Sequence, residues 1–495
     1  MGATRLLLTS GVSVFRSYSS HLPRFTPQEV TRILRSNEFT SGEFSPGTGP
    51  VKSFDINSFK SNNPIEDSHA EGLLKVGSKG FLFGVIDGHG GPACGQVVAK
   101  RILHYVASGL LSIEDLTLHL QALESQDIES EHYNLISTFN DPYTLVKDLQ
   151  ILYSQSYLEH IREIHSCIVT RMDHDEGMSL AESFIKSFES LDGAMSKEAE
   201  NRDMKTLSVA MSGAVAVMAH IDGPHLHVAS TGDCSAVLGT LSETDTWIGK
   251  KMTVEHNADN ATEVKRIISE HPESEKRTIL NKDRLLGVLA PLRAFGDFKL
   301  KWSEDKIIQL MGDAQGDHAV LPNYKTPPYL SVTPDVISHK LTARDKFLVI
   351  ASDGLWDTMT PMQVIRLIGE HMSGKITLTP LELSKESMKL SDVNALLRVR
   401  QAAVKLKPAD SNSATHIIRY ALGGTAYGVD HDRLSQMLSI PQDMFPKLLR
   451  RLPCNQFVTN GGSHPPSSIH EACHARQCHP CSTFFVSALL LVSPS

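Results

Sequence analysis

Short apolar runs that stop at polar or glycine positions recur along the chain. They lie at residues 81–86, 214–219, 225–229, 236–239 and 346–351. Runs of four to six apolar residues between turn residues are typical of strands buried in a core. The pattern therefore predicts a set of buried strands.

Longer stretches between these runs predict helices, at 96–111, 148–164 and 180–195. In the last stretch, apolar side chains recur at steps of three or four residues, at Leu180, Phe184, Phe188, Leu191 and Met195. Side chains at that spacing share one face of a helix, and we interpret the face as core packing rather than a ligand site. Strands separated by one long helical excursion predict an α/β layered domain with a helical insertion.

The composition is that of a globular protein with a large core. Of 495 residues, 41% are hydrophobic and 21% are charged, and the length allows about three domains or fewer large ones. The 48 basic and 56 acidic residues give a formal net charge of -8, which argues against a general nucleic-acid binder. A phosphorylated substrate would therefore need locally fixed cations. The only long apolar run, 484–492, is nine residues long, too short for a membrane span.

The N-terminal residues 1–28 predict a mitochondrial transit peptide and leader. They contain Arg5, Arg16 and Arg24 with several Ser and Thr, and no acidic residue precedes Glu29. Basic, hydroxylated and apolar positions without acids are typical of such presequences, although an ordinary N-terminal segment is the alternative. We expect a location in the mitochondrial matrix and cleavage between residues 16 and 20.

Four aspartates follow apolar runs or lie in tight glycine turns, namely Asp87, Asp233, Asp297 and Asp353. A carboxylate at the end of a buried strand is held by the sheet and remains accessible from its edge. Oxygen ligands of this kind suit a hard divalent cation. A single Asp-Gly pair is usually a turn, so the four positions together predict a metal site.

The segment 88–93 also fits the pattern G-x-G-x-x-A of a dinucleotide-binding turn between a strand and a helix. Two features argue against that interpretation. Asp87 would repel the pyrophosphate beside it. The acids further along, Glu114 and Asp115, follow Ser112 in a predicted first helical turn rather than ending a second strand.

Five motifs occur in an order that resembles one known family. They are NPIED at 63–67, DGHGG at 87–91, TGD at 231–233, RAFGD at 293–297 and SDGLWD at 352–357. Their order and approximate spacing resemble those of the metal-dependent Ser/Thr protein phosphatases of type 2C. Within that family, the stretches RAFGDFKLKW, PPYLSVTPDV and DKFLVIASDGLWDTM resemble the mitochondrial pyruvate dehydrogenase phosphatase branch.

The resemblance covers residues 45–447 and implies an α+β fold. That fold is a four-layer α-β-β-α sandwich of two central antiparallel sheets flanked by helices, here with a helical insertion around 112–205. The implied function is a Mg²⁺- or Mn²⁺-dependent phosphatase that dephosphorylates, and so activates, the pyruvate dehydrogenase complex. The implied partners are the phosphorylated pyruvate dehydrogenase component and the lipoyl-bearing acetyltransferase core.

By the same resemblance, Asp87 bridges two Mg²⁺ or Mn²⁺ ions, and the carbonyl of Gly88 binds one of them. Asp353 ligates the other ion, and Glu66 acts on the metal side through ordered water. Asp233 and Asp357 resemble positions that can hold a third, weaker ion. Two divalent ions sharing a carboxylate lower the pKa of a bridging water and supply hydroxide for in-line attack on a phosphate ester.

Two further residues are expected to act on the substrate. His89 lies two residues from Asp87 and is placed to protonate the departing serine oxygen as a general acid. Many relatives clamp the phosphate with an Arg four residues before the Glu of the first motif. The corresponding residue here is Asn62, which can only hydrogen-bond to the phosphate.

The C-terminal part departs from the family pattern. The family ends with a buried strand preceded by an Asp that completes the metal site around Asp353. Here no aspartate follows Asp443, and the only later side-chain carboxylate is Glu471. We therefore expect residues 448–495 to supply neither strand nor ligand, as a disordered extension or a tail from alternative splicing or a gene-model error.

Cysteines are concentrated in this tail. Cys473, Cys478 and Cys481 alternate with histidines, but their spacing is not a standard zinc-binding pattern. A missing strand would leave the sheet with unpaired backbone groups, so we expect lower stability and activity than in a chain with the usual ending. The missing ligand also leaves an alternative function open, a catalytically weakened binding protein.

Overall fold

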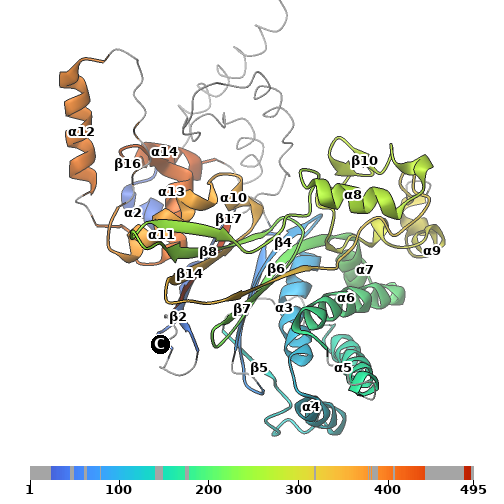
Figure 1. The fold of residues 1–495 in the computed structure, drawn as a ribbon. Coiled ribbons are helices and arrows are strands. Elements are labelled where there is room, and N and C mark those ends of the chain that lie inside the picture. Colours follow the sequence, from blue (N-terminus) through green and yellow to red (C-terminus); the bar gives the residue numbers. More distant parts are fainter. Residues whose placement is uncertain are drawn as a thin grey trace, which may run out of the picture.

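Two antiparallel sheets form the centre of the molecule, and helices cover their outer faces (Figure 1). The computed structural model describes residues 24–44, 49–60, 64–77, 80–139, 149–172, 178–316, 319–376, 378, 381, 388–404, 407–440 and 484–491. Asn62 and most of the predicted transit peptide lie outside these residues. Among the described helices, none combines the length and the hydropathy needed to cross a membrane.

The first sheet contains the last strand of the chain at an interior position. Its order is β1 (Phe39–Thr40), β2 (Val51–Phe59), β17 (Phe484–Leu491), β14 (Asp345–Ala351), β8 (Ser235–Leu241) and β9 (Trp247–Lys251). Every neighbouring pair is antiparallel.

The second sheet carries the strand that ends at the DGHGG motif. Its order is β13 (Asp335–Lys340), β7 (His225–Thr231), β6 (Gly213–Asp222), β4 (Phe81–His89), β3 (Ser68–Leu74) and β5 (Ile136–Thr138). The short β12 (Phe295–Gly296) pairs with the start of β6. Small hairpins are formed by β10 (Leu280–Asn281) with β11 (Arg284–Leu285) and by β15 (Gly424–Thr425) with β16 (Gly428–Val429).

Side-chain alternation along β14 explains how the layers are held. Leu348 and Ile350 belong to the core between the two sheets, whereas Phe347, Val349 and Ala351 belong to the core under the outer helices. Successive residues of a strand point to opposite faces, so a strand buried on both sides is apolar at every position. This is why the sequence shows an uninterrupted apolar run there.

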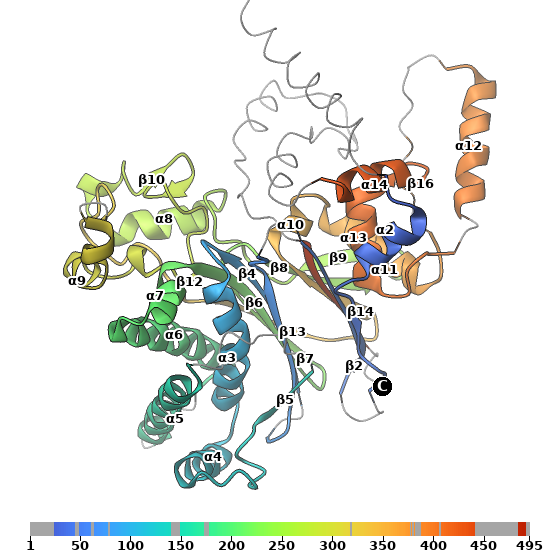
Figure 2. The same ribbon diagram turned by 180° about the vertical axis from the view of Figure 1, so that it is seen from behind.

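Helices on the second sheet include the insertion. These are α3 (Ala93–Gly109), α4 (Ile113–Ser125), α5 (Gln150–Met172), α6 (Leu180–Glu198), the 3₁₀ turn Ala199–Asn201 and α7 (Met204–Met211). In Figure 2, α3 runs along the sheet, and α6 and α5 lie outside it.

Helices on the first sheet come from both ends of the described chain. They are α2 (Pro27–Leu34), α10 (Asp353–Trp356), α11 (Pro361–Met372), α13 (Ser413–Gly423) and α14 (His431–Leu438). The helix α12 (Leu390–Val404) stands away from this layer in both ribbon views.

The part of the chain that follows β9 and precedes β13 forms a separate lobe beside the sandwich (Figure 1). It contains α8 (Ala261–Glu270), the 3₁₀ turns Glu273–Glu275 and Phe298–Leu300, the hairpin β10–β11 and α9 (Glu304–Gln315). Arg293 joins it to the sandwich, because its guanidinium donates to Glu263 of α8 at 2.8 Å and to Thr333 O before β13 at 2.8 Å.

The predicted layers and elements are confirmed. Each of the five predicted strands and three predicted helices is present, although α5 ends at Met172, eight residues beyond its expected end. The four-layer α+β arrangement is the one expected. The dinucleotide interpretation fails, since β4 is antiparallel to both neighbours and Ser112 caps α4 by accepting a hydrogen bond from Asp115 N.

Two predicted boundaries need correction. The expectation that the tail supplies no strand is wrong, because β17 lies between β2 and β14 and pairs with both. The apolar run 484–492 is long enough for a strand, and pairing it satisfies the backbone groups of two neighbouring strands. At the other end, the folded domain starts before residue 45: Val30 and Leu34 are buried, and Phe25 N donates to Ser435 Oγ at 2.7 Å.

Candidate active site

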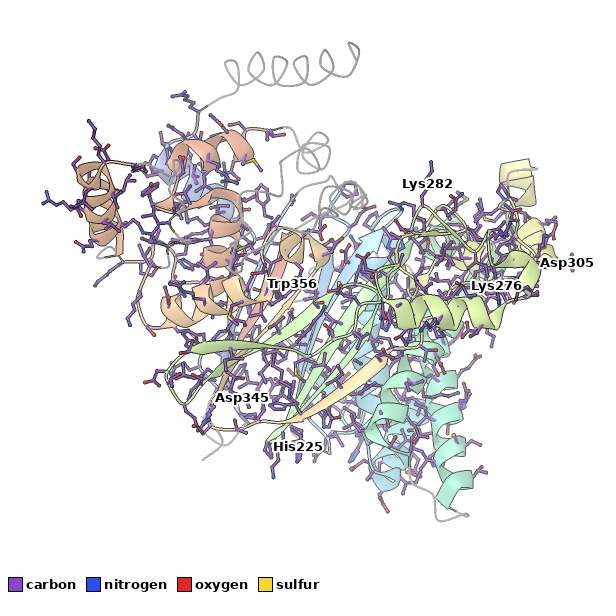
Figure 3. All side chains as sticks on the ribbon, turned by 45° about the horizontal axis from the view of Figure 1, so that its top comes forward. His225, Lys276, Lys282, Asp305, Asp345 and Trp356 are labelled. Carbon is purple, nitrogen blue, oxygen red and sulfur yellow. The ribbon has the colours of Figure 1, made fainter. Side chains whose placement is uncertain are left out.

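The predicted acidic residues gather where several strands end on one side of the sandwich. Asp87 lies near the end of β4, and Asp353 starts the short helix α10 shortly after β14. Asp233 lies in the turn between β7 and β8. Figure 3 labels Trp356 of α10 at this end, while His225 and Asp345, the first residues of β7 and β14, lie at the opposite end.

The first two motifs are packed tightly against each other. A methyl group on Gly88 would lie 2.5 Å from the carbonyl oxygen of Glu66, so only glycine permits this approach. The carboxylate of Glu66 in turn accepts a hydrogen bond from Gly91 N at 2.6 Å. Glu66 of the first motif therefore packs directly against the end of β4.

Burial and mutual repulsion set the electrostatics of these acids. Burial raises the pKa of Asp67, Asp87 and Asp353 well above the usual range, and the charge of neighbouring carboxylates raises it further. Asp233 follows the same pattern, with burial first and the charge of Asp357 next, and its pKa rises to about 6. Glu66 contributes to the repulsion felt by Asp67. Carboxylates far apart in the sequence thus lie within electrostatic reach of one another.

Some of these carboxylate oxygens have no partner within the described part of the chain. Oδ1 of Asp353 is buried without a hydrogen bond, and the two buried oxygens of Asp67 interact only with Ser352 and Asp87 among the described residues. Buried carboxylates are normally hydrogen-bonded or coordinate a metal. Hard oxygen donors with excess negative charge fit divalent cations such as Mg²⁺ or Mn²⁺. In the described residues, no three His, Cys, Asp or Glu side chains are already arranged around one ion position.

His89 lies at the end of β4, beside the acids, and has a specific partner. Its Nε2 lies 2.5 Å from Oδ2 of Asp297 in the RAFGD motif. Burial alone would lower the pKa of His89, but the charge of Asp297, its hydrogen bond, and the charges of Asp233 and Glu66 outweigh burial and raise the pKa. The structure therefore favours a protonated imidazole next to the acidic cluster.

The predicted site residues that the structure describes lie together at this end of the sandwich. They are Asp87, Gly88, His89, Glu66, Asp233, Asp353 and Asp357. Asn62 lies outside the described residues.

Sequence reasoning missed two residues of this site. Asp67 was part of a recognised motif but had no role assigned, although two adjacent acids directly before a buried strand are the signal for it. Asp297 was recognised as a strand-end acid, but its contact with His89 joins residues more than two hundred positions apart and leaves no local signal.

Comparisons with known proteins agree with this geometry. Residues 154–393 match the family described as Protein phosphatase 2C. The chain is 38% identical over 448 residues to "[Pyruvate dehydrogenase [acetyl-transferring]]-phosphatase 1, mitochondrial" from Bos taurus, which covers 87% of this chain and 82% of that protein. It is 36% identical over 439 residues to "[Pyruvate dehydrogenase [acetyl-transferring]]-phosphatase 2, mitochondrial" from Homo sapiens. This match covers 85% of this chain and 81% of that protein.

A more distant relative carries the same name. It is the phosphatase 1 of this name from Saccharomyces cerevisiae, 27% identical over 430 residues, covering 80% of this chain and 67% of that protein. These similarities support an active enzyme and give no support to the binding-protein alternative. The chain belongs to the protein phosphatase 2C family and is a metal-dependent protein serine/threonine phosphatase.

Proposed function

We propose that this phosphatase acts in mitochondria on the phosphorylated pyruvate dehydrogenase component, hydrolysing phosphoserine and so activating the complex. The single observation that carries the proposal is the 38% identity, over most of both chains, to proteins named as mitochondrial phosphatases of that enzyme. The Arg-rich N-terminus without acids supports import, and we assign the matrix as the compartment.

The acidic cluster is proposed to hold two Mg²⁺ or Mn²⁺ ions. Asp87 would lie between them, the carbonyl of Gly88 and the carboxylate of Asp353 would each take one, and Glu66 would act through water. We add Asp67, because it is buried within reach of the charges of Asp353 and Glu66, and a cation there would offset their repulsion. When bound, such a pair of ions supplies a nucleophilic water at neutral pH and offsets the charge of the phosphate.

Asp233 and Asp357 are proposed to hold a third, weaker ion. The charge of Asp357 is the main carboxylate contribution to the raised pKa of Asp233, so the two repel each other in the metal-free protein. A cation between them would remove that repulsion.

His89 is proposed as the general acid. Its pKa is raised by Asp297, so the imidazole holds a proton that it can give to the departing serine oxygen near neutral pH. Asn62 is proposed to hydrogen-bond to the phosphate; it lies outside the described residues.

Phosphate release from a phosphoserine peptide of the pyruvate dehydrogenase component tests the activity. We expect release that depends on Mg²⁺ or Mn²⁺, stops on addition of EDTA and is lost in Asp87→Asn. Asp345→Asn is the matched control, because it changes a buried aspartate of the same sandwich at the far end from the site. Release that survives EDTA or Asp87→Asn would contradict the two-metal mechanism.

Location and docking need separate experiments. Import of the radiolabelled chain into isolated mitochondria, followed by protease treatment after rupture of the outer membrane, tests the matrix assignment. We also propose docking on the lipoyl-bearing acetyltransferase core. Binding to a lipoylated domain but not to its unlipoylated form would support that partner, and equal binding to both would contradict it.

A further inference from the structure

The hydrogen bond between His89 and Asp297 depends on three backbone segments that meet at one residue. Gly213 is the first residue of β6 and lies opposite His89 of β4 and opposite Gly296 of β12. A methyl group on Gly213 would lie 2.1 Å from Asp297 Oδ2 and 2.3 Å from His89 Nε2. The absence of a side chain at this position is what leaves room for the carboxylate and the imidazole to meet.

The backbone around Asp297 is shaped to bring its carboxylate to His89. Gly296 and Asp297 have consecutive positive φ angles of 66° and 48°, which makes a tight left-handed turn. Gly296 is required, because a methyl group there would lie 2.3 Å from the carbonyl oxygen of Ser212. Asp297 N donates to the same carbonyl at 3.0 Å. A non-glycine residue is uncommon in this conformation and often marks a functional site.

The turn is also anchored to the helical insertion. Gly296 N donates to Asp192 Oδ1 of α6 at 2.9 Å. Lys301 Nζ donates to Asp192 Oδ2 at 2.8 Å and to the carbonyl of Ala294 at 2.7 Å, so it ties both sides of the turn to the same carboxylate. All of these groups are well buried, which makes the position of Asp297 rigid.

We propose that Asp297 is a positioning residue, which holds the imidazole of His89 in the orientation needed for proton transfer to the leaving serine oxygen. A carboxylate only accepts hydrogen bonds, so Nε2 of His89 carries the hydrogen and the ring is fixed about its side-chain torsions. The inference rests on the proposed function, in which His89 is the general acid.

The reaction step is ordinary ester hydrolysis. The oxygen of water bonds to phosphorus, and the bond between phosphorus and the serine oxygen breaks with its electron pair on that oxygen. A proton on Nδ1 of His89 joins the serine oxygen while Nε2 keeps its hydrogen bond to Asp297, and the proton lost by the attacking water returns through solvent to Nδ1. Asp297 takes no part in bond making, so its removal should cost rate only where a proton must reach the leaving oxygen.

Two substrates separate positioning from a structural role. A phosphoserine peptide has a leaving alkoxide that needs a proton, whereas p-nitrophenyl phosphate releases a stable anion. We expect Asp297→Asn and His89→Ala each to lower kcat on the peptide by roughly a hundredfold. On p-nitrophenyl phosphate we expect each to lower it by less than about threefold. Asparagine tolerates positive φ, so Asp297→Asn keeps the backbone of the turn.

The double variant tests whether the two residues act together. If Asp297 acts through His89, adding Asp297→Asn to His89→Ala causes no further loss on the peptide. Losses that multiply, or an Asp297→Asn effect equal on both substrates, would overturn the proposal. Asp297→Glu, which keeps the charge on a longer side chain, should show the same selective loss and serves as the second variant.

Controls distinguish failure of this inference from failure of the proposed function. Asp345→Asn removes the carboxylate beside His339 at the far end of the sandwich, and we expect it to leave the ratio of the two activities at the wild-type value. A wild-type chain inactive on both substrates, or a fully active His89→Ala, would contradict the proposed function and this inference with it. An active wild type, an impaired His89→Ala and an unchanged Asp297→Asn would overturn this inference alone.

Discussion

Asp345 and Asp353 lie at opposite ends of the same strand, and their environments are opposite in kind. Asp345 starts β14 and accepts hydrogen bonds from Thr240 Oγ1 at 2.7 Å and from Thr342 N at 2.8 Å, with His339 Nε2 at 3.1 Å. Burial would raise its pKa, but these hydrogen bonds outweigh burial and lower it. Asp345 is therefore a charged residue whose charge the protein itself satisfies.

Asp353, just beyond the other end of β14, is buried among other carboxylates. Its Oδ1 has no hydrogen-bond partner within the described part of the chain, and burial followed by the charge of Asp87 raises its pKa well above the usual range. The comparison teaches that burial does not distinguish a structural acid from a proposed metal ligand. What distinguishes them is whether the protein supplies hydrogen-bond donors or leaves the oxygens for a cation.

Asp353→Asn should have the largest effect on activity. It removes one charge from the cluster, so we expect kcat with Mg²⁺ to fall by about a thousandfold, which corresponds to about 4 kcal/mol of transition-state stabilisation. Without metal, the same change relieves repulsion and should raise the thermal melting temperature. Phosphate release and melting in EDTA measure the two effects. Full activity in this variant would place the catalytic ion elsewhere.

Metal removal should come next in size. Mg²⁺ at one hundred times its Kd raises the free energy of unfolding by about 2.7 kcal/mol if it binds only the folded chain. Denaturant titrations of the wild type with Mg²⁺ and with EDTA measure this difference. Asp353→Asn should lose most of it and Asp345→Asn should keep it. An equal gain in both variants would mean that the ion binds away from the cluster.

Asp345→Asn should lower the free energy of unfolding and leave the catalytic rate unchanged. The amide accepts fewer hydrogen bonds and leaves Thr240, Thr342 or His339 without a partner, so we expect a loss of about 2 kcal/mol in the free energy of unfolding. Because this end of the sandwich is remote from the acids, kcat on folded protein should stay at the wild-type value. A loss of kcat without a loss of stability would reverse the assignment of the two aspartates.

The pH dependence of the metal-free protein should be the smallest effect. The raised pKa of Asp233, about 6, exceeds its unfolded value near 4, so the folded chain binds more protons between these pH values. The free energy of unfolding should therefore fall as pH rises from about 4 to about 6. The lowered pKa of Asp345 acts in the opposite sense and only below about pH 4.

Asp233→Asn provides the control for this window. Denaturant titrations in EDTA should give a flatter profile for it than for the wild type. Asp345→Asn should keep the wild-type slope between pH 4 and 6. A slope that is unchanged in Asp233→Asn would show that the other buried acids with raised pKa, Asp67, Asp87 and Asp353, cause the pH dependence there.

Sequence patterns predicted most of the strands and helices, because each of these elements produces a periodic pattern of apolar residues within a short stretch of sequence. The run at 346–351 is apolar at every position because β14 packs on both faces, and the five apolar residues of 180–195 lie on the buried face of α6. Strand-end position predicted Asp87, Asp233 and Asp353 for the same reason: a strand and the turn after it are local features.

What sequence reasoning missed depends on partners distant in the chain. Thr342 and His339, which bind Asp345, lie close to it in the sequence, but its third partner Thr240 is more than one hundred residues away. Asp87, whose charge raises the pKa of Asp353, is also more than one hundred residues away from it. The role of 484–491 was missed for a related reason. The length of its apolar run excluded a membrane span but did not indicate a partner strand. The partners of this segment are β2 and β14, which are both distant from it in the sequence.

The interior position of β17 has a consequence for how the chain folds. Residues 51–59 and 484–491 are more than four hundred positions apart in the sequence, yet they are neighbours in one sheet. A contact of such high sequence separation carries a large loop-closure entropy and slows folding. The first sheet cannot be completed until residues 484–491 have left the ribosome, so a partly synthesised chain exposes the edges of β2 and β14 to unwanted pairing.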